Sequence, residues 1–124
     1  MLKTVESMMS GQPDKVCDQI ADTIVDEYLR RDPEARVDVQ VFGSQGMLMI
    51  GGQVESRADF DIGALAKKIY QEIGYPDDIE VFANISELSE EMRRIKTGVM
   101  DTVVINGYAT RETTERMPRP VVFA

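Results

Sequence analysis

Residues 10–31 read SGQPDKVCDQIADTIVDEYLRR. Proline suits the first position of a helix, where its missing N–H has no partner to lose, so Pro13 marks a helix start with Ser10 or Gly11 as the cap. Apolar residues then recur every four positions in two neighbouring rows, which predicts a helix from Pro13 to Arg31 with one wide apolar face. The rows are Val16, Ile20, Ile24, Tyr28 and Cys17, Ala21, Val25, Leu29.

The start of this helix also carries a chemical signal. A glycine turn followed by the neighbouring carboxylate and ammonium of Asp14 and Lys15 suits a metal-bound polyphosphate. Two interpretations of Asp14 stay open, because it also begins a row of acids four residues apart that is typical of a solvated helix face. Gln12 stands where an acid, base or cation is expected, and the chain has no histidine, so no imidazole takes part.

Composition limits the classes of function. The 124 residues carry a net charge of −8, with 14 basic and 22 acidic side chains, which argues against nucleic-acid partners and anionic membranes. No apolar run is long enough to span a bilayer, and no signal peptide is expected at the N-terminus. Cys17 is the only cysteine and falls on the apolar side of the helix, so we expect a core residue in a reducing cytoplasm.

The rest of the chain predicts a single α+β domain over residues 1–124, a mainly antiparallel sheet with helices packed on one face. Val37, Val39 and Val41 alternate with other residues, and with the methionines they are expected to supply apolar groups to the bare face of the sheet, which indicates an oligomer. Gly51-Gly52 indicates a bulge or a close backbone approach. The predicted elements are strands 37–42 and 47–54 as a hairpin, helix 62–73 started by Asp59 or Asp61 and ended by Gly74, strand 79–83, a helix from Glu87 to Lys96 capped by Ser86, and strands 102–105 and 121–123.

Several motifs, in their order and spacing, resemble the N-terminal region of the S-adenosylmethionine synthetase (methionine adenosyltransferase) family. They are Ser10 to Lys15 with Asp18-Gln19-Ile20, Asp32 to Val37, Gly46 to Gly52, Glu72 to Tyr75, Gly107 to Thr113 and Met117 to Pro120. The family's chains are about three times longer and have three similar domains, so the resemblance covers a first third. It implies one domain of the synthetase fold, with ATP and methionine as substrates and Mg²⁺ and K⁺ as cofactors.

The resemblance also implies roles for single residues. Asp14 matches a magnesium ligand, and Lys15 matches a residue that serves the triphosphate of ATP. Gln12 replaces the family's catalytic histidine, so no catalytic residue is assigned. Gln40 replaces a glutamate that binds the cation, and Gln53 replaces the glutamate that holds the ammonium group of methionine.

Asp101 keeps the aspartate that reaches methionine, although the glycines of that signature are absent. An alternative interpretation of Asp101 is an ordinary turn residue. A compact helix ending at Lys96 is expected where the family has a long mobile gate.

Three functions stay open. The chain is expected to be inactive alone and to act as a subunit of a methionine adenosyltransferase, in a homo- or hetero-oligomer that can include a longer synthetase-like chain. Alternatively, it is a non-catalytic scaffold that dimerises with or regulates a true synthetase. The third interpretation is an incomplete portion of a longer protein.

Overall fold

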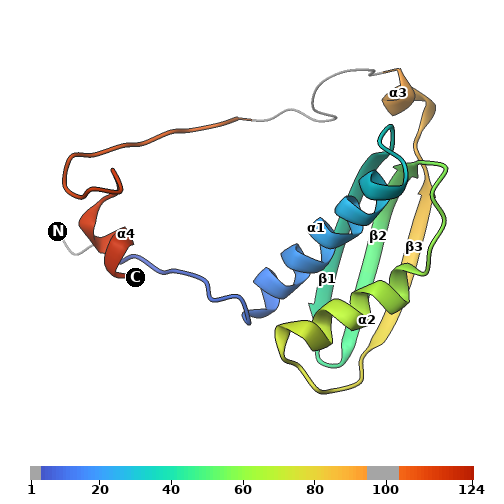
Figure 1. The fold of residues 1–124 in the computed structure, drawn as a ribbon, viewed down its shortest axis with the longest axis horizontal. Coiled ribbons are helices and arrows are strands. Elements are labelled where there is room, and N and C mark those ends of the chain that lie inside the picture. Colours follow the sequence, from blue (N-terminus) through green and yellow to red (C-terminus); the bar gives the residue numbers. More distant parts are fainter. Residues whose placement is uncertain (1–3, 95–103) are drawn as a thin grey trace. The chain divides into compact units, whose positions relative to one another are not determined.

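The computed structural model describes residues 4–94 and 104–124, which fall into two compact units. The larger unit, Ser10–Lys96, is called the body below; the other consists of the two ends of the chain, and its described residues are 4–9 and 104–124. Figure 1 labels the elements in chain order. They are α1 (Pro13–Arg31), β1 (Arg36–Ser44), β2 (Met47–Glu55), α2 (Ile62–Ile73), β3 (Glu80–Glu87), α3 (Glu90–Arg93) and α4 (Arg119–Phe123).

Helix α1 has the predicted bounds. Its apolar rows pack on the sheet, and Ile20 and Ile24 are fully buried. The cap is Gln12, whose side chain makes no capping hydrogen bond, so the expected capping by Ser10 or Gly11 is wrong. At the other end the Asp32 carboxylate accepts hydrogen bonds from Ser56 Oγ at 3.0 Å and the Arg57 N–H at 2.8 Å, which lowers its pKa.

Within residues 4–94 and 104–124 the sheet has three strands, in the order β1-β2-β3. The hairpin β1–β2 is antiparallel as predicted, whereas β3 pairs with β2 in parallel, which the α2 crossover between them makes possible. Helices α1 and α2 lie on the same face of this sheet (Figure 1). The α+β class with helices on one face is therefore confirmed, with one parallel pair in the sheet.

The paired glycines of β2 mark a close backbone approach, one of the two predicted alternatives. Gly52 has φ +151°, and a Cβ built there would lie 2.0 Å from the carbonyl oxygen of Asp38. Gly51 has ordinary space, with its nearest neighbour, the Asn84 carbonyl oxygen, at 3.9 Å. Only Gly52 therefore requires the absence of a side chain.

Helix α2 confirms its predicted start and end. The carboxylate of Asp61 accepts a hydrogen bond from the N–H of Ala64, and Gly74 adopts the left-handed conformation that ends the helix. Its apolar face joins α1 over the sheet, with Ala66 fully buried.

Three expectations about later segments are wrong. Strand β3 continues to Glu87 and does not end at residue 83, because it keeps pairing with β2 through Gln53 and Val54. The helix expected after Ser86 is therefore shorter: it is α3, and its cap is Ser89. The expected end of that helix, Lys96, lies outside the described residues. Residues 102 and 103 of the predicted strand 102–105 lie outside them too, and residues 104 and 105 form no regular structure.

Residues 121–123 belong to helix α4 and not to a strand, because Pro120 in its first turn fixes a helical φ. None of the helices in the described ranges has the length and apolar character that crossing a membrane requires.

The expected face is wrong for the valines of β1 and right for Met49. Val39 is buried in the core, and Val37 and Val41 pack against it, so these valines lie under the helices. The alternate positions form the other face, which we call the open face. By strand register its three central rows are Phe42, Met49 and Phe82; Gln40, Gly51 and Asn84; and Asp38, Gln53 and Ser86. Phe42, Met49 and Phe82 are at least half exposed there.

Candidate functional site

The start of α1 presents the candidate polyphosphate-binding residues to solvent. Gln12 and Asp14 are exposed and Lys15 is half-buried. The carbonyl of Gln12 accepts the first helical hydrogen bond, from the N–H of Val16 at 2.8 Å. The N–H groups of the first turn have no partners within the helix and carry its positive end, which favours an anion near Lys15 and a cation-binding carboxylate at Asp14.

The loop before α1 is held from two directions, by contacts that the sequence analysis did not predict. The amide of Gln19 donates to the carbonyl oxygen of Ser10 at 2.8 Å and to that of Lys15 at 3.1 Å. The hydroxyl of Tyr75, which follows α2, donates to the carbonyl oxygen of Gly11. The loop that carries Gln12 is thus fixed both to its own helix and to the α2–β3 connection. Both residues lie in the quoted motifs, but only the folded chain shows what they contact.

Gln40 and Gln53 lie on the open face, as strand register requires. A broad hollow of about 1080 Å³ covers this face, and both amides line it together with Phe42 and Phe82. Neither amide carries charge, so any ligand bound there is recognised by hydrogen bonds and apolar contact rather than by a formal negative charge. The hollow offers neutral polar groups next to exposed apolar ones, while the exposed carboxylate of Asp38 lies on the same face in the row of Gln53.

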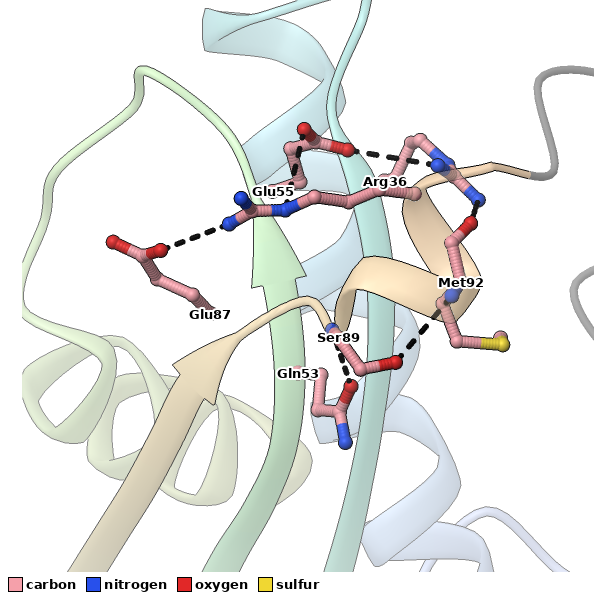
Figure 2. Close-up of polar contacts among 7 residues, drawn as sticks. Arg36, Gln53, Glu55, Glu87, Ser89 and Met92 are labelled. Carbon is pink, nitrogen blue, oxygen red and sulfur yellow. Dashed lines mark hydrogen bonds and ion pairs between the residues drawn. The ribbon is translucent and has the colours of Figure 1, made fainter.

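Figure 2 shows that the side chain of Gln53 already has a partner within the chain. Its amide oxygen accepts a hydrogen bond from the backbone N–H of Ser89 at 3.1 Å, and the hydroxyl of Ser89 in turn accepts from the N–H of Met92 at 3.4 Å. Gln53 therefore helps to hold the segment that follows β3. One of the two lone pairs that a ligand's ammonium could use on this oxygen is therefore taken.

Two arginines complete this attachment (Figure 2). Arg36 donates to the carbonyl oxygen of Met92 at 2.6 Å and lies 3.5 Å from the carboxylate of Glu55. Arg93 joins Glu55 at 3.7 Å to Glu87 at 2.8 Å. Leu88 is buried at the base of the segment. Residues 88–94, here called the clasp segment, are thus fixed to the end of the sheet where β1 begins and β2 ends.

The body does not bring the predicted site residues together. Asp14 and Lys15 lie on α1, which packs on one face of the sheet, whereas Gln40 and Gln53 lie on the opposite face. Asp101 lies outside the described residues. A site that used all of them would need groups from more than one surface.

The predicted cation ligands fit only partly. Magnesium is usually held by one or two carboxylates together with substrate phosphates and water, so Asp14 fits as one ligand. Gln40 offers one neutral oxygen for K⁺. The described residues contain no group of three His, Cys, Asp or Glu side chains placed to hold a metal ion. Neither cation site is complete within this part of the chain.

Cys17 is buried, as predicted, and is not placed for nucleophilic chemistry. Burial raises the pKa of its thiol, and the carboxylates of Asp14 and Asp18 raise it further, against the lowering effect of a hydrogen bond with the backbone of Gly43. The thiol therefore stays protonated at neutral pH.

Comparisons with known proteins agree with the motifs. Residues 1–97 match the model of the S-adenosylmethionine synthetase N-terminal domain. The chain is 32% identical over 133 residues to the S-adenosylmethionine synthase of Aquifex aeolicus, which covers 99% of this chain and 35% of that protein. The synthase of Salinibacter ruber is 35% identical over 136 residues, with the same two shares.

A solved S-adenosylmethionine synthetase from Campylobacter jejuni superposes with a TM-score of 0.78 at 33% identity, covering 92% of this chain and 32% of that one. The chain thus spans about a third of the length of the relatives it matches. With the motifs at the start of α1, the shared fold and the family model over most of its length, the chain belongs to the S-adenosylmethionine synthetase family, through that family's N-terminal domain.

Proposed function

We propose that this chain is a subunit or partial relative of methionine adenosyltransferase that is inactive alone and needs a partner chain to form S-adenosylmethionine from ATP and methionine. One observation carries the proposal. The family's fold is kept along nearly the whole chain. By the resemblance, however, the neutral glutamines Gln12, Gln40 and Gln53 stand at three positions where the family has a histidine or a glutamate.

Loss of charge at these positions argues against independent catalysis. A glutamine at position 12 donates hydrogen bonds but cannot place positive charge against a polyphosphate. Losing a single electrostatic catalytic group typically costs about 100- to 1000-fold in rate. The amide oxygen of Gln53 in addition already accepts a hydrogen bond from the N–H of Ser89. We propose that a partner supplies the missing imidazole, the acid for the substrate ammonium and the basic groups for phosphate.

The open face supports an oligomer. Phe42, Met49 and Phe82 form an exposed apolar row across all three strands, and a contiguous apolar patch of this kind usually marks an interface. We propose a homo- or hetero-oligomer through this face, in the cytoplasm, where a longer synthetase-like chain is the expected partner. Mg²⁺ with ATP and K⁺ are the proposed cofactors of the assembled enzyme.

The test is an assay of the purified chain with ATP, methionine, magnesium and potassium. We expect no S-adenosylmethionine from the chain alone, and turnover after it is combined with the partner that co-purifies from its source. Turnover by the isolated chain would overturn the proposal.

Nucleotide binding tests the start of α1 separately. We expect weak, magnesium-dependent ATP binding centred on Asp14 and Lys15, measured by calorimetry. Asp14→Asn should abolish the dependence on magnesium. Asp18→Asn, an exposed acid one turn further along the same helix, is the matched control and should bind like the parent. Equal binding by the parent and Asp14→Asn would contradict a role for this carboxylate.

The second candidate function is a non-catalytic scaffold for a true synthetase, which the structural use of Gln53 favours. The two functions differ in one measurement. A scaffold raises the activity or stability of its synthetase equally well as the parent chain or as Asp14→Asn, whereas a catalytic subunit loses its effect on turnover with this substitution.

A further inference from the structure

A second cavity lies within the body, on the helix-covered side and away from the open face. It has a volume of about 280 Å³ and lies between the start of α1, the β1–β2 turn and the α2–β3 connection. Its walls include Pro13 and Cys17 of α1, Met47 beside the turn, and Tyr70, Tyr75 and Ile79. Neither the predicted catalytic chemistry nor the open face uses this cavity.

The walls of the cavity are fixed. The rings of Tyr70 and Tyr75 stack with their centroids 4.8 Å apart and their planes 20° apart, which makes one side flat and aromatic. The hydroxyl of Tyr75 is tied to the carbonyl oxygen of Gly11. On the opposite side the turn lies close to α1, since a Cβ at Gly43 would lie only 3.1 Å from the sulfur of Cys17. A cavity with such walls exists before a ligand arrives, which lowers the cost of binding.

The lining defines the chemistry of an occupant. Among the described residues no charged side chain lines the cavity, so a charged ligand would lose its hydration without compensation. Two phenol rings and the sulfur atom of Cys17 favour an aromatic partner, because stacked rings and sulfur–ring contacts are both attractive. An apolar cavity of about 150 Å³ is enough for one benzene ring. The volume here suits one or two fused rings.

We propose that this cavity binds a neutral aromatic compound of one or two rings, and that its occupancy stabilises the loop before α1. Two residues connect the cavity to this loop directly. Tyr75 lines the cavity and donates a hydrogen bond to the carbonyl oxygen of Gly11, and Pro13 lines the cavity and is the first residue of α1. A ligand that packs on these residues holds Gln12, Asp14 and Lys15 in their present arrangement. The inference stands whether or not the chain takes part in synthesis of S-adenosylmethionine.

Indole, a neutral two-ring compound, is the probe for this site, with indole-3-acetate as its charged counterpart. We expect indole to shift the backbone amide signals of residues 11–17, 43–48 and 70–79 in NMR spectra at millimolar concentration, and indole-3-acetate to leave them unchanged. Because Cys17 is the only cysteine, its reaction with a thiol reagent reports directly on the cavity. Bound indole should slow this reaction several-fold.

The substitution Tyr70→Ala, which removes one of the two stacked rings of the wall, should abolish both effects, and circular dichroism checks that the variant is folded. If the variant does not fold, the NMR shifts and the Cys17 labelling rate of the parent chain test the proposal by themselves. Shifts that map to Phe42, Met49 and Phe82 on the open face, equal shifts with the charged compound, or an unchanged rate of Cys17 labelling would each overturn the proposal. None of these readouts depends on enzymatic turnover.

Discussion

The two faces of the sheet are built from alternate residues of the same strands, yet one forms the core and the other is exposed. Under the helices, Val39, Leu48 and Ile50 join Ile20 and Ile24 in a buried core. On the open face the neighbouring positions hold Phe42, Met49 and Phe82, which are left to solvent or a partner, beside the amides of Gln40 and Gln53. The first face stabilises the body by itself. The second adds little to the stability of one chain and carries the positions where function is expected.

The largest effect should come from the place where the two strands of the hairpin approach most closely. Gly52→Ala puts a Cβ 2.0 Å from the carbonyl oxygen of Asp38 at a φ that L residues rarely adopt, so the hairpin must distort. We expect a loss of about 3 to 5 kcal/mol in unfolding free energy, measured by urea denaturation.

Gly51→Ala is the matched control for this change. Its Cβ would point to the open face with 3.9 Å to the nearest atom, so the loss should stay below about 1 kcal/mol. Equal losses at the two glycines would show that β-strand propensity, and not the close approach, sets the effect.

Two adjacent residues of β2 compare the faces directly. Ile50 is 1% exposed under the helices, and Met49 is 50% exposed on the open face. Ile50→Ala leaves a cavity in the core and should cost about 2 to 5 kcal/mol. Met49→Ala should cost less than about 1 kcal/mol in a dilute monomer. Similar losses at the two positions would mean that a partner chain covers the open face while the chain is folded.

The helix-covered face is the part that sequence could predict. The period of α1 places Ile20 and Ile24 on one stripe, and the caps of α2 at Asp61 and Gly74 are local signals. The alternation of Val37, Val39 and Val41 shows that these valines share one face of the sheet, but it does not show which face meets the helices.

The candidate site was harder to predict, because its contacts are long-range. Arg36 and Met92 are 56 residues apart, and Ser89 and Gln53 are 36 apart. Strand β3 continues past Ala83 only because β2 lies beside it in parallel register. The motif at the start of α1 located Asp14 and Lys15, whereas the roles of Gln19 and Tyr75 in fixing their loop required the folded chain.

Self-association tests the open face without disturbing the core. Phe82→Glu places a charge in the apolar row, which we expect to weaken association about tenfold or more, measured by light scattering across a dilution series. Gln71→Glu adds the same charge to an exposed position of α2 and should associate like the parent. A parent chain that is monomeric at micromolar concentration would contradict the assignment of this face as an interface.

The clasp segment links the open face to the end of the sheet. Gln53→Leu removes the acceptor for the N–H of Ser89, so exchange of the Ser89 amide proton should rise about three- to tenfold, as expected for one hydrogen bond. Gln53→Glu keeps an oxygen acceptor and should leave the exchange nearly unchanged. If both variants exchange like the parent, Ser89 is protected by its surroundings and not by Gln53.

The smallest effect concerns an ion pair on the solvent side of α1. Glu27 accepts hydrogen bonds from Arg30 and Arg31 at 2.7 to 2.8 Å, which lower the pKa of its carboxyl from 4.5 to about 2. A carboxyl whose pKa is lower in the folded state stabilises the fold fully above its unfolded pKa, and this contribution fades as the pH falls from about 4.5 to about 2. The melting temperature of Glu27→Gln should therefore lie slightly below that of the parent at neutral pH and converge with it in acid.

Both arginines are solvent-exposed, so added salt should shrink the difference at neutral pH. A difference in melting temperature that persists at low pH or in high salt would assign the effect to packing of the Glu27 side chain. The ion pairs with Arg30 and Arg31 would then contribute nothing to the stability of α1.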